Sequence, residues 1–151
     1  MKSKAFTFVA VLVVMLIVGS VAVYAYDSSA GKKHATARDI LVDLWDSGRG
    51  LLSTQVLQEF FVIATSKVAK PLDPKDARRI VADLLKWSIV VNDGDSILGA
   101  TDIHLRYRYS FWDSLIIHAA LSGGASLLLS EDMAHGQTIE STEIRNPFVS
   151  G

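Results

Sequence analysis

Short apolar segments alternate with helical patterns along most of this chain, and that alternation limits the folds open to it. Residues 51–52, 88–91 and 127–129 have the length and composition of buried strands, and longer segments with apolar residues at helical spacing separate them. Strands that alternate with helices at these intervals predict a mainly parallel sheet covered by helices on both faces. We therefore expect an α/β domain.

Start and stop signals define the expected helices. Ser53 or Thr54 can cap one helix, Asp73 followed by Pro74 opens another, and Ser110 with Asp113 resembles a capping box. The expected helices cover residues 34–47, 54–66, 74–87, 96–107 and 111–122. Residues 138–144 are expected to form one further strand.

Composition bounds the possibilities. A chain of 151 residues, half of them hydrophobic, can bury one core of ordinary size. The absence of cysteine excludes disulfides and thiolate metal sites, so any metal must use oxygen or imidazole ligands. A formal charge of -1 gives no general attraction to nucleic acid, so RNA binding would need a local basic patch.

The N-terminus departs from this ordinary composition. Lys2 and Lys4 precede an almost uninterrupted apolar run over residues 5–26, which is long enough to cross a bilayer as a helix. By itself the run is typical of a signal peptide or a membrane anchor, and the small residues around Ala25 would allow cleavage there.

Three acids occupy positions where an open α/β sheet can build an ion site. Asp113 lies in the first turn of an apolar helix, Asp132 follows a short apolar strand, and Glu59 lies in the middle of a helix. A structural role remains open for each. Asp113 can simply be an acid that the helix dipole stabilises in the first turn. Glu59 can be an exposed helix residue, and Asp132 can form a turn.

The segments that carry these acids resemble a known family. Residues 53–60 (Ser-Thr-Gln-Val-Leu-Gln-Glu-Phe), 110–120 and 127–137 strongly resemble the PIN-domain nucleases, in particular the VapC-type toxins of bacterial toxin-antitoxin pairs. The resemblance covers roughly residues 21–148. It implies a three-layer α/β/α fold with a mainly parallel central sheet over residues 18–151, after an apolar N-terminal extension over residues 1–17.

The resemblance also implies a function. Glu59, Asp113 and Asp132 match the acidic positions of the family, which are expected to converge around Mg²⁺ or Mn²⁺ and to serve as catalytic residues. The implied activity is that of a metal-dependent endoribonuclease that hydrolyses RNA phosphodiester bonds. The implied partners are an RNA substrate, a cognate antitoxin and a second copy of the chain.

One departure from the family pattern weakens this expectation. The first strand of the family ordinarily carries an Asp-Thr-Asn triplet, and alignment puts Val18, Gly19 and Ser20 there. Valine cannot coordinate a hard cation, and Ser20 offers only a neutral oxygen. Whether the chain is an enzyme therefore stays open. The alternative is a catalytically inactive PIN-like module that binds nucleic acid or antitoxin.

The resemblance also gives the apolar run a second interpretation. It assigns residues 18–26 to the first, buried strand, which leaves residues 5–17 for a membrane, about 20 Å of helix against a hydrocarbon core of about 30 Å. A folded first strand and a full span therefore exclude each other. We expect a cytoplasmic protein, with membrane anchoring through residues 5–26 as the alternative.

Other residues give weaker signals. Residues 104–109 interleave basic and aromatic side chains and could guide RNA, or could form a solvated helix end. His118 is interpreted as a core or edge histidine, His135 as a turn residue, and Phe111 and Trp112 as packing residues. Basic side chains that could border an RNA site or simply solvate helices are Lys67, Lys70, Arg78 and Arg79.

Overall fold

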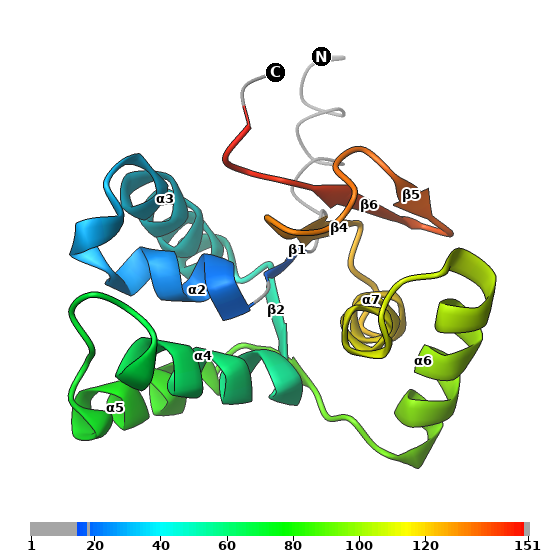
Figure 1. Cartoon of the computed structure of the whole chain (residues 1–151), viewed down its shortest axis with the longest axis horizontal. Coiled ribbons are helices and arrows are strands. Elements are labelled where there is room, and N and C mark those ends of the chain that lie inside the picture. Colours follow the sequence, from blue (N-terminus) through cyan, green and yellow to red (C-terminus); the bar gives the residue numbers. More distant parts are fainter. Residues whose placement is uncertain (1–14, 18, 150–151) are drawn as a thin grey trace.

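A six-stranded sheet organises the chain, and its order is β3-β2-β1-β4-β6-β5 (Figure 1). The structure is a computed structural model and describes residues 15–17 and 19–149. β1 is central and pairs in parallel with β2 and β4, while only β5 is antiparallel to its neighbour among the described strands. The mainly parallel sheet is therefore confirmed. The strands are β1 Met15–Ile17, β2 Gly50–Ser53, β3 Ser88–Val90, β4 Leu127–Leu129, β5 Thr138–Ile139 and β6 Thr142–Arg145.

Helices cover the sheet on both sides, as expected for a three-layer α/β/α fold. α2 and α3 lie on one side and α6 and α7 on the other, while α4 follows β2 and packs against α2 and α5 (Figure 1). A short 3-10 helix, η1 (Ser28–Ala30), joins α2 to α3. The α-helices are α2 Gly19–Tyr26, α3 Lys32–Ser47, α4 Thr54–Ser66, α5 Pro74–Leu84, α6 Gly94–Tyr107 and α7 Phe111–Ser122.

The segment predicted as the first strand is a helix. Residues 19–26 form α2, and the central strand is the three residues of β1 that precede position 18. The prediction was wrong because Val21, Ala22 and Val23 are buried on all sides, and continuous apolarity does not distinguish a buried helix from a buried strand. β1 therefore lies within the segment expected to be an N-terminal extension.

The membrane interpretation concerns residues 5–26, of which half, including residue 18, lie outside the described part of the chain. Among the described residues, no helix has the length and apolarity needed to span a bilayer. Residues 5–14 of the apolar run are not described.

The C-terminal strand also differs from its prediction. Instead of one strand over residues 138–144, β5 and β6 form an antiparallel hairpin in which Ile139 pairs with Thr142. Glu140 turns the chain with a φ of 52°. The segment between Ile139 and Ile144 is Glu-Ser-Thr-Glu, with no glycine or proline to mark a turn, so the sequence pattern did not reveal it.

Local capping places the helix starts close to where the sequence puts them. The Ser53 hydroxyl accepts a hydrogen bond from the Val56 N–H at 3.2 Å, and Ser110 accepts one from the Asp113 N–H at 3.1 Å. Asp93 forms a complete capping box with Ser96, so α6 starts two residues earlier than predicted. The predicted 74–87 helix ends at Leu84.

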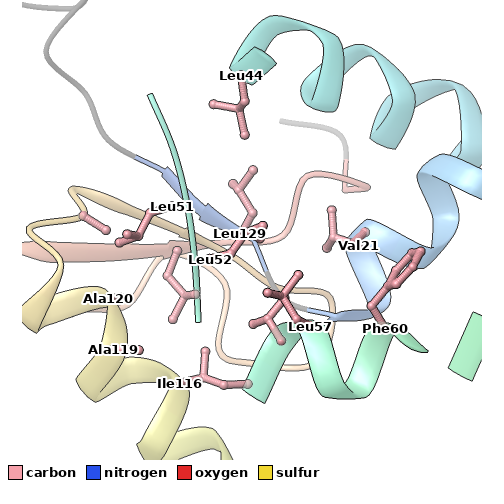
Figure 2. Packing of buried hydrophobic residues seen from close by; sticks show 14 of the residues in the cluster. Val21, Leu44, Leu51, Leu52, Leu57, Phe60, Ile116, Ala119, Ala120 and Leu129 are labelled. Atoms are coloured by element: carbon pink, nitrogen blue, oxygen red, sulfur yellow. The ribbon is translucent and has the colours of Figure 1, made fainter. Parts of the chain in front are cut away.

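One core holds the helices that carry the predicted site residues (Figure 2). Phe60 of α4 is fully buried and meets the ring of Tyr26 edge to face, with centroids 5.7 Å apart. Ile116 of α7 is buried in the same core. Burial of a side chain of this size contributes about 1.5–3 kcal/mol. Glu59, adjacent to Phe60, and Asp113, one helical turn before Ile116, are thereby fixed relative to the sheet.

Candidate acidic site at the carboxyl ends of the strands

The three predicted acids line one pocket. Glu59 comes from α4 after β2, Asp113 from the first turn of α7, and Asp132 from the loop after β4. The cavity has a volume of about 140 Å³. It lies beyond the carboxyl end of β1, where the strand order changes direction, which is the usual ligand position in open α/β sheets. Ser20 and Ser130 also line it, with Gly19, Ile63, Ile116 and Met133.

The pocket concentrates negative charge. Burial raises the pKa of the Glu59 carboxyl, a hydrogen bond from Gln55 partly offsets this, and the charge of Asp113 raises it further. Burial likewise raises the pKa of Asp113, where the hydrogen bond with Ser110 opposes the rise and the charge of Asp132 adds to it. Among the described residues, no lysine or arginine lines the cavity. Such an arrangement favours binding of a proton or a cation.

Three residues that the sequence did not single out shape the pocket. A Cβ atom added to Gly19 would lie 2.9 Å from the Cβ atom of Glu59, so glycine permits the close approach of α4 to α2. The Gln55 side-chain amide donates a hydrogen bond to the Trp112 carbonyl at 3.2 Å and so joins α4 to α7. The Ser130 hydroxyl accepts from the Asp132 N–H at 3.3 Å. All three lie in segments that carry the family resemblance: Gln55 in residues 53–60, Ser130 in residues 127–137, and Gly19 beside Val18 at the aligned triplet.

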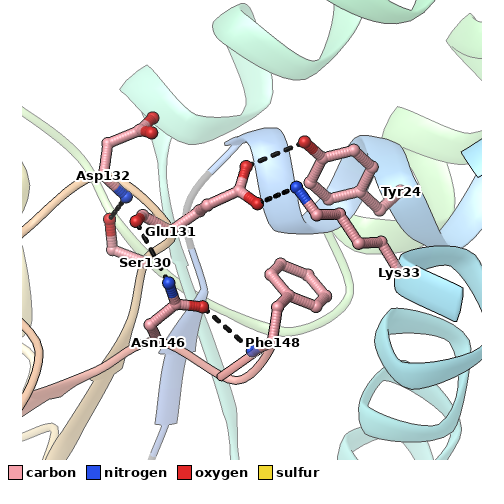
Figure 3. A network of polar contacts seen from close by, with 7 residues as sticks. All are labelled: Tyr24, Lys33, Ser130, Glu131, Asp132, Asn146 and Phe148. Carbon is pink, nitrogen blue, oxygen red and sulfur yellow. Dashed lines mark hydrogen bonds and ion pairs between the residues drawn. The ribbon is translucent and has the colours of Figure 1, made fainter. Parts of the chain in front are cut away.

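A polar network anchors the loop that carries Asp132 (Figure 3). Glu131 accepts a hydrogen bond from the Tyr24 hydroxyl at 2.8 Å and forms an ion pair with Lys33. The Asn146 side-chain amide donates to the Glu131 carbonyl at 3.2 Å. The loop is therefore tied to α2, to α3 and to the segment after β6.

The pocket offers the oxygen ligands that a hard cation prefers, but its acidic side chains are too far apart to hold one ion together. Three carboxylates and two hydroxyls offer the oxygen ligands that Mg²⁺ and Mn²⁺ prefer. Within residues 15–17 and 19–149, however, no group of three or more His, Asp or Glu side chains stands close enough together to hold one ion. Position 18, where the family pattern has its first acid, is not among the described residues.

The other predicted residues lie elsewhere. Asp27 caps η1. His118 is not among the residues that line the acidic pocket and packs against Gly99 of α6, and its Nδ1 atom has no hydrogen-bond partner among the described residues. His135 accepts a hydrogen bond from the Asn146 N–H at 2.9 Å. Trp112, predicted to pack, is 64 % exposed, so that interpretation was wrong.

Fold and site together define an α/β domain with an acidic pocket at the point where the strand order changes direction. The sequence pattern of the PIN domain matches residues 15–138, and the chain belongs to the PIN domain family. No curated protein matches the sequence closely enough to count as a relative.

Two solved structures share this fold. The chain is 17 % identical to VapC20 of Mycobacterium tuberculosis, described as a sarcin-ricin loop cleaving toxin, with a TM-score of 0.57 over 76 % of this chain and 86 % of that one. It is also 17 % identical to a chain of VapBC2 from Rickettsia felis bound to a DNA fragment from their promoter, with a TM-score of 0.62 over 88 % of this chain and 98 % of that one. At this identity, the similarity establishes the fold.

Proposed function

We propose that the chain is a ribonuclease of the VapC toxin kind, which hydrolyses RNA phosphodiester bonds at the acidic pocket. The observation that carries the proposal is the presence of Glu59, Asp113 and Asp132, from three separate segments, in one cavity whose described lining residues include no lysine or arginine. Membership of the PIN domain family and the two VapC structures support it.

We assign the chemistry to the pocket's own side chains. The raised pKa values of Glu59 and Asp113 make their carboxylates better proton acceptors, so either could take a proton from an attacking water. The hydroxyls of Ser20 and Ser130 could donate hydrogen bonds to phosphate oxygens. A Mg²⁺ or Mn²⁺ ion would supply positive charge to offset that of the phosphate, but Glu59, Asp113 and Asp132 would have to come closer together than they stand here to hold it jointly.

Cleavage of RNA by the full chain at increasing Mn²⁺ concentration tests the proposal. Asp113→Asn should lower the cleavage rate by about 10²-fold or more, the usual loss when a general acid or base is removed. Asp102→Asn is the matched control, because Asp102 is exposed on α6 and does not line the pocket. Mn²⁺ affinity measured by electron paramagnetic resonance should fall in the first variant only. Equal cleavage and equal affinity in both variants would contradict the proposal.

A second candidate is an inactive PIN-like module that binds nucleic acid or antitoxin. Two observations favour it: valine stands at the first acidic position, and no three described acids stand close enough to hold one ion. Val18→Asp separates the candidates. Cleavage that appears only in the restored protein supports the inactive module, whereas cleavage by the unaltered chain eliminates it.

We also propose a cognate antitoxin, a homodimer and a cytoplasmic location. The antitoxin proposal is supported by the fold similarity to VapBC2, and the other two come from the family resemblance. Sedimentation velocity tests the dimer. Cell fractionation tests the location, since recovery of the intact chain in the membrane fraction would favour an anchor at residues 5–26.

A further inference from the structure

The corner between α6 and α7 carries an exposed tryptophan beside the acidic pocket. Trp112 directly precedes Asp113, and 64 % of its surface is exposed, although its backbone carbonyl is held by Gln55. Its ring contacts only Phe111 among the described aromatic residues, with centroids 5.2 Å apart. A large flat ring kept in solvent, one residue from an acid that lines the pocket, is available for stacking.

Two arginines occupy the same corner. Arg106 and Arg108 are exposed at the end of α6, and neither forms an ion pair with any described residue. Arg108 adopts a φ of 64° as the C-cap of α6, where glycine or asparagine is usually favoured. A charged residue kept in an unfavourable backbone conformation suggests a role for its side chain.

The corner is also held in place. His104 contacts the Tyr109 carbonyl through Nδ1, and the Tyr109 hydroxyl donates a hydrogen bond to the side chain of Gln137, in the loop before β5. Ser110 caps α7 at the same point. The turn that holds Arg108, with Arg106 at the end of α6 and Trp112 at the start of α7, is therefore braced.

We propose that the α6–α7 corner, defined by Arg106, Arg108 and Trp112, is a docking surface for single-stranded RNA that leads to the acidic pocket. Trp112 stacks on an unpaired base, and the two arginines contact the phosphates of the same strand. Stacking on aromatic rings with basic side chains alongside is the general mode by which proteins hold single strands. The choice of RNA rests on the proposed function, whereas the docking itself does not require hydrolysis.

The test uses the full chain and a fluorescein-labelled oligouridine in EDTA. Trp112→Ala should raise the Kd about 5- to 150-fold, the range expected for loss of one base–aromatic stack. Unlabelled oligouridine should quench the intrinsic fluorescence, and Trp112→Phe should remove most of that quenching. Trp45→Phe is the control, because Trp45 is also partly exposed but lies on α3, paired with the ring of Trp87 at 5.5 Å.

Salt dependence tests the arginines. Arg106→Ala and Arg108→Asn should each reduce the slope of log Kd against log salt by about 0.7, the value for one phosphate contact on a single strand. Asparagine is chosen at position 108 because it tolerates positive φ. Arg78→Ala on α5, another exposed arginine, should leave the slope unchanged.

Several outcomes would overturn the inference. One is an unchanged Kd in Trp112→Ala, and another is an equal reduction of the salt slope in Arg78→Ala. Binding of oligothymidine but not of oligouridine would also overturn it. So would a loss of self-association in Trp112→Ala with RNA affinity intact. The two proposals fail separately. RNA binding by the corner without cleavage in Mn²⁺ would refute the ribonuclease, and cleavage with an unchanged Kd in Trp112→Ala would refute the docking surface.

Discussion

Arg108 holds a backbone conformation that costs stability. For a residue other than glycine, the left-handed conformation costs about 1–2 kcal/mol, and glycine loses about 0.5–1 kcal/mol more than alanine through its greater unfolded-state freedom. The net gain expected from glycine is about 0.5–1 kcal/mol. The chain keeps arginine at this position.

Arg108→Gly is therefore expected to stabilise the protein by about 0.5–1 kcal/mol and to weaken its binding to oligouridine. Urea unfolding measures the first effect and fluorescence titration the second. Glu140→Gly is the control, since Glu140 also has a positive φ, of 52°, but lies in the β5–β6 turn. It should stabilise the chain and leave RNA binding unchanged. Weaker RNA binding in both variants would argue against a specific role for Arg108.

At the scale of the element, α4 shows how local signals and packing cooperate. Ser53 starts the helix, and the buried side chains of Val56 and Phe60 hold it against the core. Glu59 is carried into the pocket on this helix. The cap is therefore a structural determinant of the site.

Ser53→Ala should destabilise the protein by about 1–2 kcal/mol, because the buried Val56 N–H loses its acceptor. Amide hydrogen exchange should accelerate most in the first turn of α4, which chemical denaturation alone would not reveal. Thr65→Ala removes an exposed hydroxyl near the other end of α4 that bonds the Phe61 carbonyl at 2.7 Å, and it should change stability by less than about 0.5 kcal/mol. Equal effects of the two substitutions would refute the capping argument.

At the scale of the whole molecule, Glu131 connects segments far apart in sequence. It joins α2 through Tyr24 and α3 through Lys33, 107 and 98 residues away. Burial alone would raise the pKa of its carboxyl, but the hydrogen bonds from Lys33 and Tyr24 together hold it below its usual 4.5. A lowered folded-state pKa stabilises the fold above the unfolded value, and this contribution is lost as pH falls through the folded value.

Glu131→Gln should therefore lower the unfolding free energy at pH 7, and the difference from the unaltered chain should shrink as pH falls below 4.5. Denaturant unfolding at a series of pH values measures this. Glu143→Gln is the control, because among the described residues Glu143 forms an ion pair only with Arg145, two residues away, and both side chains are partly exposed. A difference that is independent of pH would show that the charge of Glu131 is not responsible.

Sequence alone determined the features that depend on neighbours in the chain. The caps at Ser53, Asp73 and Ser110, the strand at residues 127–129 and the alternation that predicts a parallel sheet all follow from local hydrogen bonding and periodicity. The resemblance that pointed to Glu59, Asp113 and Asp132 also came from local motifs.

Only the tertiary structure decided the features that depend on distant parts of the chain. Residues 19–26 are helical because their all-round apolar surface is enclosed by α3 and α4, which no local pattern reveals. Likewise, the shared pocket of the three acids, the close approach at Gly19 and the exposure of Trp112 result from how the elements pack. Propensity acts within one helix or strand, whereas burial and proximity are set by all of them together.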